Sequence, residues 1–166
     1  MKFTLSWLKE HLDTDWDINS ISSTLTNIGL EVESITDRAE ELAPFKVAKV
    51  LSAKKHPNAD KLKVCDVTIG DKESLKVVCG APNARDGLYT VYAPPGAIIP
   101  KTKLKLKIAK IRGVESSGML CSENELNISK ESTGIIDLKK KDNDIGKSFF
   151  KSSSEKIIDI SITPNR

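Results

Sequence analysis

The residues whose types and spacing most clearly suggest a binding chemistry are cations near the middle of the chain. They are Lys101, Lys103, Lys105, Lys107, Lys110 and Arg112. On a β-strand, side chains alternate between two faces, so this spacing predicts four lysines on one face and Leu104, Leu106 and Ile108 on the other. Such a cationic face suits a phosphate-bearing partner. It fits equally well a solvated strand whose lysines protect a sheet edge from aggregation.

A second basic group surrounds the sequence Pro57-Asn58-Ala59-Asp60, which predicts a turn between two strands. Its candidate phosphate ligands are Lys54, Lys55 and Lys61, with His56 and Lys63 beside them. An ordinary polar hairpin explains the same composition. Aromatic residues are scarce, so stacking on bases is weakly supported, and contacts with phosphates and nucleic-acid shape are favoured over base identity.

Residues for catalysis or metal binding are not arranged in any recognisable pattern. The sequence lacks phosphate-binding glycine loops and a nucleophile elbow, and neither His11 nor His56 lies in an acid–base motif. The acidic residues 123 and 125 point to different sides of a helix at i, i+2 spacing. The three cysteines, Cys65, Cys79 and Cys121, have no C-x-x-C spacing, so we expect buried reduced thiols and no metal site.

Charge is segregated along the chain. Residues 40–151 carry 21 Lys/Arg and 14 Asp/Glu, a charge of +7, whereas the remaining residues carry 5 and 9, a charge of −4, within a net charge of +3. A basic middle segment indicates a polyanionic partner. No apolar run approaches the roughly 20 residues that cross a bilayer, and charged residues interrupt the N-terminus too early for a signal peptide. We therefore expect a cytoplasmic protein without membrane contact.

Periodicity predicts an α+β unit formed from the two ends of the chain. Apolar residues at 5, 8 and 12 and at 18, 21, 25 and 28 have helical spacing, and Gly29 is expected to end the second helix. Residues 30–35 and 158–162 alternate as half-buried strands. Because isolated strands need partners, we expect these two in one sheet, giving a discontinuous domain of residues 1–38 plus 154–166. The sequences EELAP and KSSSEK are the expected linkers.

The intervening residues 39–153 predict a mostly-β domain. The strand-like runs are residues 45–52, 62–69, 75–79, 88–93, 104–111 and 134–138. Short strands separated by turns rich in glycine and proline favour a small barrel, and a five-stranded OB-fold barrel is the natural candidate for this length with a basic face. The predicted fold class is thus α+β, with an inserted OB-fold barrel.

Three ordered blocks of this insert resemble one family of tRNA-binding modules. The blocks are HPNADKLKVCDVTIG at residues 56–70, VVCGAPNAR at 77–85 and LKIAKIRGVESSGMLCSENEL at 106–126. They are similar to the OB module of methionyl-tRNA synthetase extensions, of free-standing tRNA-binding proteins and of the bacterial phenylalanyl-tRNA synthetase β subunit. The flanking sequences MKFTLSWLKEHL, INSISSTLTNIGLEVESI and ISITPNR resemble the β subunit.

The resemblance implies an accessory tRNA-binding and assembly module from the N-terminal part of a longer subunit, in the ligase that charges tRNA(Phe) with phenylalanine. Its implied partners are tRNA, the rest of the β subunit and the α subunit of a heterotetramer of two α and two β chains, and not DNA. In this family the aminoacylation site lies on α and the editing site lies downstream in β. We therefore expect no catalytic residue and no cofactor here, whereas ATP and magnesium belong to the whole enzyme.

Two alternatives remain open at this point. The chain could be a free-standing OB-fold tRNA-binding chaperone, which is often dimeric in the family. The OB module could also serve only for protein–protein contact inside the synthetase.

Overall fold

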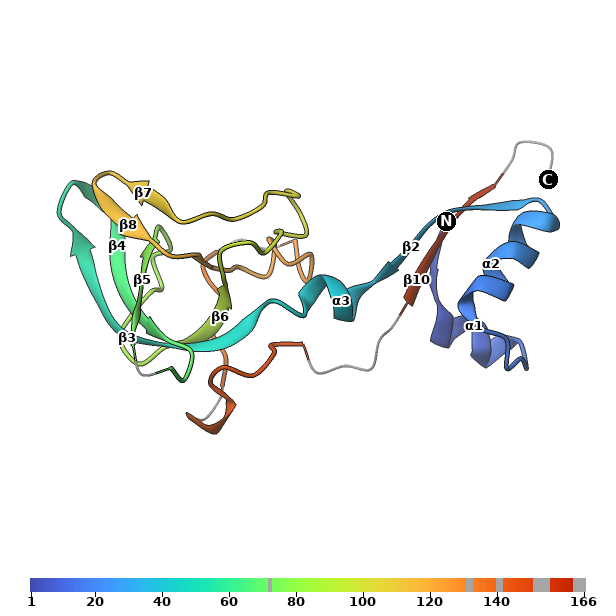
Figure 1. The fold of residues 1–166 in the computed structure, drawn as a ribbon, viewed down its shortest axis with the longest axis horizontal. Helices are drawn as coiled ribbons and strands as arrows, with labels where there is room; N and C mark the ends of the chain where they lie inside the picture. The colour runs from blue at the N-terminus through green and yellow to red at the C-terminus, as the bar shows by residue number, and fades with distance from the viewer. Residues whose placement is uncertain (72, 131–132, 140–141, 151–155, 163–166) are drawn as a thin grey trace. The chain divides into compact units, whose positions relative to one another are not determined.

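A computed structural model describes residues 1–71, 73–130, 133–139, 142–150 and 156–162 of the 166-residue chain. Its contacts divide the chain into two compact units. Unit 1 comprises Met1–Glu41 with Lys151–Arg166, and unit 2 comprises Leu42–Phe150. Figure 1 shows the helices and strands of each unit. No helix in the described part of the chain is long and apolar enough to cross a membrane.

Unit 1 contains a three-stranded antiparallel sheet and two helices that pack on it. Its elements are β1 (Lys2–Thr4), α1 (Leu5–His11), α2 (Ile18–Asn27), β2 (Leu30–Asp37) and β10 (Lys156–Ile162). The strand order is β1-β10-β2, so the last described strand lies between the first two (Figure 1). Val32 pairs with Ile160, and Ile35 pairs with Ile158. The predicted pairing of the two alternating strands is therefore confirmed.

The helices of unit 1 begin and end at residues that satisfy free backbone groups. The Thr4 hydroxyl accepts a hydrogen bond from the Trp7 amide at 3.2 Å, and the Asp17 carboxylate accepts one from the Ser20 amide at 2.7 Å. These are N-caps, which occupy amides that have no partner inside the helix. The bonds from Ser20 also lower the pKa of Asp17. Gly29 follows α2 with φ +93°, which confirms the predicted helix end.

The core of unit 1 is small. Ile21 of α2 packs against Ile158 and Ile160 of β10, and all three are buried. Leu8 of α1 and Leu25 of α2 pack against this cluster. The apolar spacing that predicts the helices therefore also supplies the side chains that hold them on the sheet.

Unit 2 is built on a five-stranded antiparallel sheet. Its elements are β3 (Lys46–His56), β4 (Ala59–Thr68), β5 (Leu75–Cys79), β6 (Tyr89–Ala93), β7 (Ala109–Ile111), β8 (Val114–Ser116), β9 (Met119–Leu120) and the 3-10 helix η1 (Asp142–Asp144). The order of the main sheet is β5-β4-β3-β6-β9, and β7 and β8 form a separate pair. The first four predicted strands are confirmed within a few residues. The chain thus has the predicted α+β class.

The predicted strand at residues 134–138 is wrong. The Ile136 amide donates to the Cys121 carbonyl at 2.9 Å and the Leu138 amide to the Tyr89 carbonyl at 2.8 Å, but no ladder forms. The reason lies in the side-chain amide of Asn83. It donates to the Ile135 carbonyl at 2.7 Å and accepts from the Ile135 amide at 3.0 Å. A side chain therefore takes the place that a neighbouring strand would fill.

The main sheet of unit 2 is OB-like but does not close into the predicted barrel by strand pairing. Among the described strands, β5 and β9 are the two ends of the sheet order and are not paired with each other. Because β9 has only two residues, it cannot form a second ladder of useful length. Two hydrogen bonds join β5 to the chain before β9 instead. The Val78 amide donates to the Ser116 hydroxyl at 3.0 Å, and the Ser117 amide donates to the Lys76 carbonyl at 2.8 Å.

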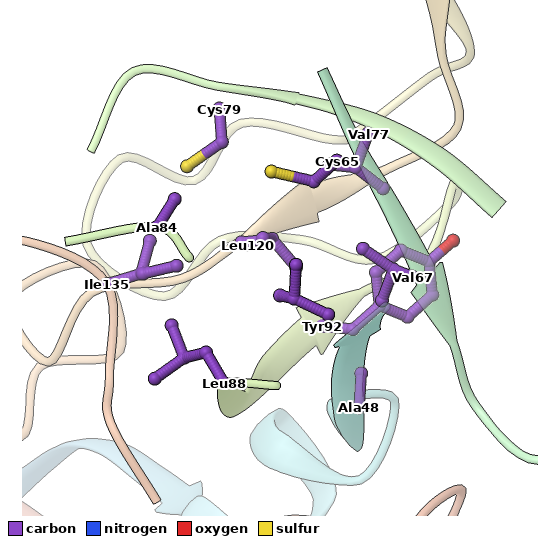
Figure 2. Packing of buried hydrophobic residues seen from close by; sticks show 11 residues of the cluster. Ala48, Cys65, Val67, Val77, Cys79, Ala84, Leu88, Tyr92, Leu120 and Ile135 are labelled. Atoms are coloured by element: carbon purple, nitrogen blue, oxygen red, sulfur yellow. The ribbon is translucent and has the colours of Figure 1, made fainter. Parts of the chain in front are cut away.

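Two buried clusters occupy the two faces of this sheet. Alternate residues of β6 contribute to them, with Tyr92 in the first cluster and Val91 in the second. Figure 2 shows the first cluster, where Cys65 and Val67 of β4 gather with Tyr92 and Leu120. These side chains fix the strands whose loops carry the basic residues.

All three cysteines are free and buried, as predicted. Burial raises the pKa of each thiol, that of Cys65 to about 11, and the rise is largest for Cys121. Thiols with raised pKa values are poor nucleophiles and poor metal ligands because both roles require the thiolate.

The linker predicted at EELAP is only partly correct. Glu40 and Glu41 belong to a short helix, α3 (Arg38–Leu42). Leu42 is fully buried and packs with Phe45 in the second cluster. An apolar side chain within a polar stretch thus belongs to the core of unit 2. Of the linker predicted at KSSSEK, residues 151–155 lie outside the described residues.

Candidate nucleic-acid interface

The lysines at 101–107 lie on an irregular hairpin and not on the predicted strand. Within residues 97–107, here called the lysine hairpin, the Ile99 amide donates to the Leu104 carbonyl at 2.9 Å, and the Leu106 amide donates to the Ala97 carbonyl at 2.8 Å. Lys103 lies at the turn with φ +55°. This left-handed residue interrupts the alternation of side chains. Of the predicted run 104–111, only Ala109–Ile111 forms a strand, β7.

The predicted apolar inner face of this segment is also wrong. Leu106 is buried at 9% exposure, but Leu104 is 59% exposed and Ile108 is 58% exposed. The lysines of the hairpin are all exposed, as expected both for a phosphate-binding face and for a solvated strand. They are Lys101, Lys103, Lys105 and Lys107. The hairpin therefore presents cations and aliphatic side chains together to solvent.

The tip of the lysine hairpin contacts a turn that follows β9. The Lys101 amide donates to the Glu125 carbonyl at 3.2 Å, and the Lys101 ammonium group contacts the Asn124 side chain. The turn itself is a capping box, because the Glu125 carboxylate accepts from the Ser122 amide at 2.7 Å while the Ser122 hydroxyl accepts from the Glu125 amide at 3.4 Å. Glu125 therefore has a structural task.

The second basic group lies at the turn between β3 and β4. Lys54 and Lys55 lie near the end of β3, Lys61 lies near the start of β4, and all three are exposed. Lys63 differs from them, because its ammonium group donates to the Pro82 carbonyl at 3.1 Å and to the Ala84 carbonyl at 2.6 Å. Lys63 thus holds the loop after β5.

The remaining candidates, Lys110 and Arg112, lie on the β7–β8 hairpin. Arg112 and Gly113 form its two-residue turn with φ +46° and +96°, which matches the turn types that suit the twist of paired strands. Both Lys110 and Arg112 are exposed. Lys110 pairs across the hairpin with Glu115.

The structure brings the β7–β8 hairpin to the β3–β4 turn. The Nε2 atom of His56 lies 3.0 Å from the Ile111 carbonyl oxygen, and the Asn58 side-chain amide donates to the Arg112 carbonyl at 3.0 Å. Figure 1 shows β7 and β8 beside the turn end of β3 and β4. These two hairpins in contact carry five exposed cations from two predicted groups and are here called the two-hairpin surface; the cations are Lys54, Lys55, Lys61, Lys110 and Arg112.

Sequence reasoning missed the roles of His56 and Asn58 because their contacts are more than 50 residues away in sequence. A signal for them was nonetheless present. A histidine and an asparagine next to a tight turn offer side-chain hydrogen bonds that a polar hairpin does not itself require. Their partners, two backbone carbonyls, leave no trace in the sequence.

One half-buried lysine of unit 2 is already neutralised. Lys49 donates to the Asp142 carboxylate at 2.8 Å, and the Tyr89 hydroxyl donates to the same oxygen at 2.6 Å. The bond from Lys49 lowers the pKa of Asp142, and the reciprocal bond raises the pKa of Lys49. This cluster ties η1 to β3 and offers a polyanion little free charge.

These cations offer binding groups for anions. In the described ranges, no three His, Cys, Asp or Glu side chains gather where they could hold a metal ion. The surface offers exposed ammonium and guanidinium groups, which bind phosphate oxygens.

The chain is similar in sequence to known tRNA-binding proteins and synthetase subunits. Residues 45–147 match a family model described as "Putative tRNA binding domain". The chain is 56% identical over 169 residues to the phenylalanine–tRNA ligase β subunit of Rhodopseudomonas palustris, and 51% identical over 174 residues to that of Nitrobacter winogradskyi. Each match covers 100% of this chain and 21% of the relative. The chain thus spans about a fifth of the length of these curated relatives.

Among solved structures, a MetRS-related protein from Pyrococcus horikoshii is 24% identical, with a TM-score of 0.45. The match covers 64% of this chain and 88% of that protein. The family model covers most of unit 2, including both basic hairpins. The chain therefore belongs to the tRNA-binding domain family that this model describes.

Proposed function

We propose that the chain is an accessory, non-catalytic part of a phenylalanine–tRNA ligase β subunit and that its unit 2 binds tRNA through exposed cations. The observation that carries this proposal is the joining of two basic groups into the two-hairpin surface, within a segment that matches a tRNA-binding family. Identity of 50% or more over the whole chain to β subunits supports the choice of enzyme.

We also propose that residues 1–38 plus 154–166 form one domain and residues 39–153 another. The two compact units support this division, with boundaries a few residues away. Partners in the whole enzyme would be the rest of the β subunit and an α subunit in a heterotetramer of two α and two β chains. ATP and magnesium would bind elsewhere in that enzyme. The enzyme would act in the cytoplasm.

The proposed binding is electrostatic and depends little on the nucleotide sequence of the tRNA. Lysine and arginine side chains that neutralise phosphates release bound counterions, so affinity falls as salt rises. The proposal includes all nine candidate cations, which are Lys54, Lys55, Lys61, Lys101, Lys103, Lys105, Lys107, Lys110 and Arg112. The two-hairpin surface is the principal part, because contacts between the two hairpins bring cations of both predicted groups together before the ligand arrives.

A filter-binding titration of the 166-residue chain with tRNA at several salt concentrations tests the proposal. If about four to six cations neutralise phosphates, log K falls against log salt with a slope of roughly −3 to −5. Binding without salt dependence, or no binding at low salt, would contradict the proposal. In a parallel assay, the chain alone is expected to show no phenylalanine-dependent exchange of pyrophosphate into ATP, since it lacks the groups for that reaction.

A second function is favoured by the exposed aliphatic side chains of Leu104 and Ile108 beside the lysines. Such a mixed surface also suits contact with another protein of the synthetase. Replacing both residues by serine distinguishes the two functions. Contact with protein would weaken, whereas electrostatic binding of tRNA would keep its salt dependence.

A further inference from the structure

The β7–β8 hairpin needs support from outside itself. It has three residues in each strand and forms a sheet of only two strands. An isolated two-stranded hairpin is marginally stable in water. Its base is fixed to β5 by the bond from the Val78 amide to the Ser116 hydroxyl. Its tip, which carries Arg112, is fixed by side chains of the β3–β4 turn.

His56 is one of these two side chains, and its ring is fully committed. It is 4% exposed. Its Nδ1 atom accepts a hydrogen bond from the backbone amide of Asn58 at 3.0 Å. Because a neutral imidazole has one donor and one acceptor, Nε2 carries the proton and donates to the Ile111 carbonyl at 3.0 Å. The ring orientation is therefore set by both bonds together.

Asn58 is the second side chain, and it holds the turn at the hairpin tip. Its side-chain amide donates to the backbone carbonyl of Arg112. The backbone of Arg112 is left-handed, with φ +46°. A Cβ atom added at Gly113 would lie 3.4 Å from the Asn58 amide nitrogen, so the neighbouring glycine permits this close approach. The turn and the side chain fit each other.

We propose that His56 and Asn58 are positioning residues that clamp the β7–β8 hairpin so that Lys110 and Arg112 join Lys54, Lys55 and Lys61 in one phosphate-binding surface. This inference rests on the proposed tRNA binding. Neither positioning residue supplies a positive charge to the phosphates. Their contribution is to order the hairpin before binding, which removes part of the entropic cost that a flexible hairpin would incur on the tRNA.

The variant Asn58→Leu tests the clamp with little change in side-chain size and none in charge. Asn58 is exposed, so folding of the main sheet is expected to survive. Hydrogen exchange should accelerate at the amides of β7 and β8 and stay unchanged in β3 and β4. Asn58→Gln, which keeps an amide donor on a longer side chain, should recover part of the protection.

Affinity for tRNA supplies the readout that a merely structural role would not change. If the clamp positions two cations, the salt slope of Asn58→Leu becomes less steep by about 1.4–1.8, at roughly 0.7–0.9 per phosphate contact. The double variant Lys110→Ala, Arg112→Ala should show the same loss. Adding Asn58→Leu to that double variant should change the slope no further, because the cations that it positions are already gone.

Three results would overturn the inference. One is an unchanged slope in Asn58→Leu while the wild-type chain binds with a steep slope, which would leave the proposed function standing. Another is a full additional loss when Asn58→Leu is combined with the double variant. The third is a wild-type chain that does not bind tRNA, which would overturn both proposals even if hydrogen exchange showed the clamp.

Discussion

The β7–β8 hairpin and the lysine hairpin lie close together in sequence, and they carry cations on backbones that are held differently. The first is fixed at its base by Ser116 and at its tip by His56 and Asn58. The second has irregular strands, its tip is tied to the turn after β9 by the bond from the Lys101 amide to the Glu125 carbonyl, and Leu104 lies exposed on it. A basic pattern therefore does not by itself define a binding surface. Cations that are ordered before binding lose less entropy on the ligand.

The largest expected difference concerns the apolar side of the lysine hairpin. Leu106→Ala removes a buried side chain and should lower the free energy of unfolding by about 2–4 kcal/mol. Leu104→Ala removes an exposed one and should change it by less than about 0.5 kcal/mol. Urea denaturation of both variants measures the two effects. Equal losses of unfolding free energy in the two variants would contradict this difference. They would support the regular strand, with one continuous buried face, that the alternating pattern predicts.

A smaller effect is expected at the two turns, where Lys103 and Arg112 have left-handed backbones. This conformation costs an ordinary residue about 1–2 kcal/mol, and asparagine adopts it more readily. Lys103→Asn and Arg112→Asn should therefore each stabilise unit 2 by up to about 1 kcal/mol. Lys105→Asn, outside the left-handed region, is the matched control. Thermal melting compares the three variants, and destabilisation by both turn variants would exclude this account of the turns.

The helices, strands and turns of the chain differ in how well the sequence predicts them. Regular periods predict α2 and the strands β3 to β6, because burial of alternating or helically spaced side chains decides those elements. The left-handed turn at Lys103 breaks such a period without a glycine to announce it. Asn83 likewise replaces a strand by pairing with Ile135 through its side chain. Contacts between distant residues thus decided what local patterns could not.

The same limit applies to the candidate site. All nine cations could be chosen from composition and spacing, and all nine are exposed. Their grouping could not be predicted, because it depends on two hydrogen bonds from His56 and Asn58 to backbone carbonyls. Every residue has a carbonyl, so sequence cannot single out which ones are used.

A pH-dependent effect is expected in the first buried cluster, where Cys65 lies on β4, the strand that carries Lys61. Burial raises the pKa of Cys65 from 9.0 to about 11. As pH rises from about 9 to about 11, the unfolded chain loses this proton first, so stability should fall over that range. The stability of the Cys65→Ala variant should fall less steeply as pH rises. Denaturation at several pH values measures this slope, and identical slopes would contradict a buried neutral thiol.

The salt dependence of tRNA affinity in two matched variants tests whether the two-hairpin surface is the principal tRNA contact. Lys55→Ala with Lys110→Ala removes two charges from the two-hairpin surface, and Lys103→Ala with Lys105→Ala removes two from the lysine hairpin. The first pair should make the slope of log K against log salt less steep by about 1.4–1.8, and the second pair by less than half of that. Equal losses, or a larger loss from the second pair, would contradict the claim that the ordered two-hairpin surface is the principal tRNA contact.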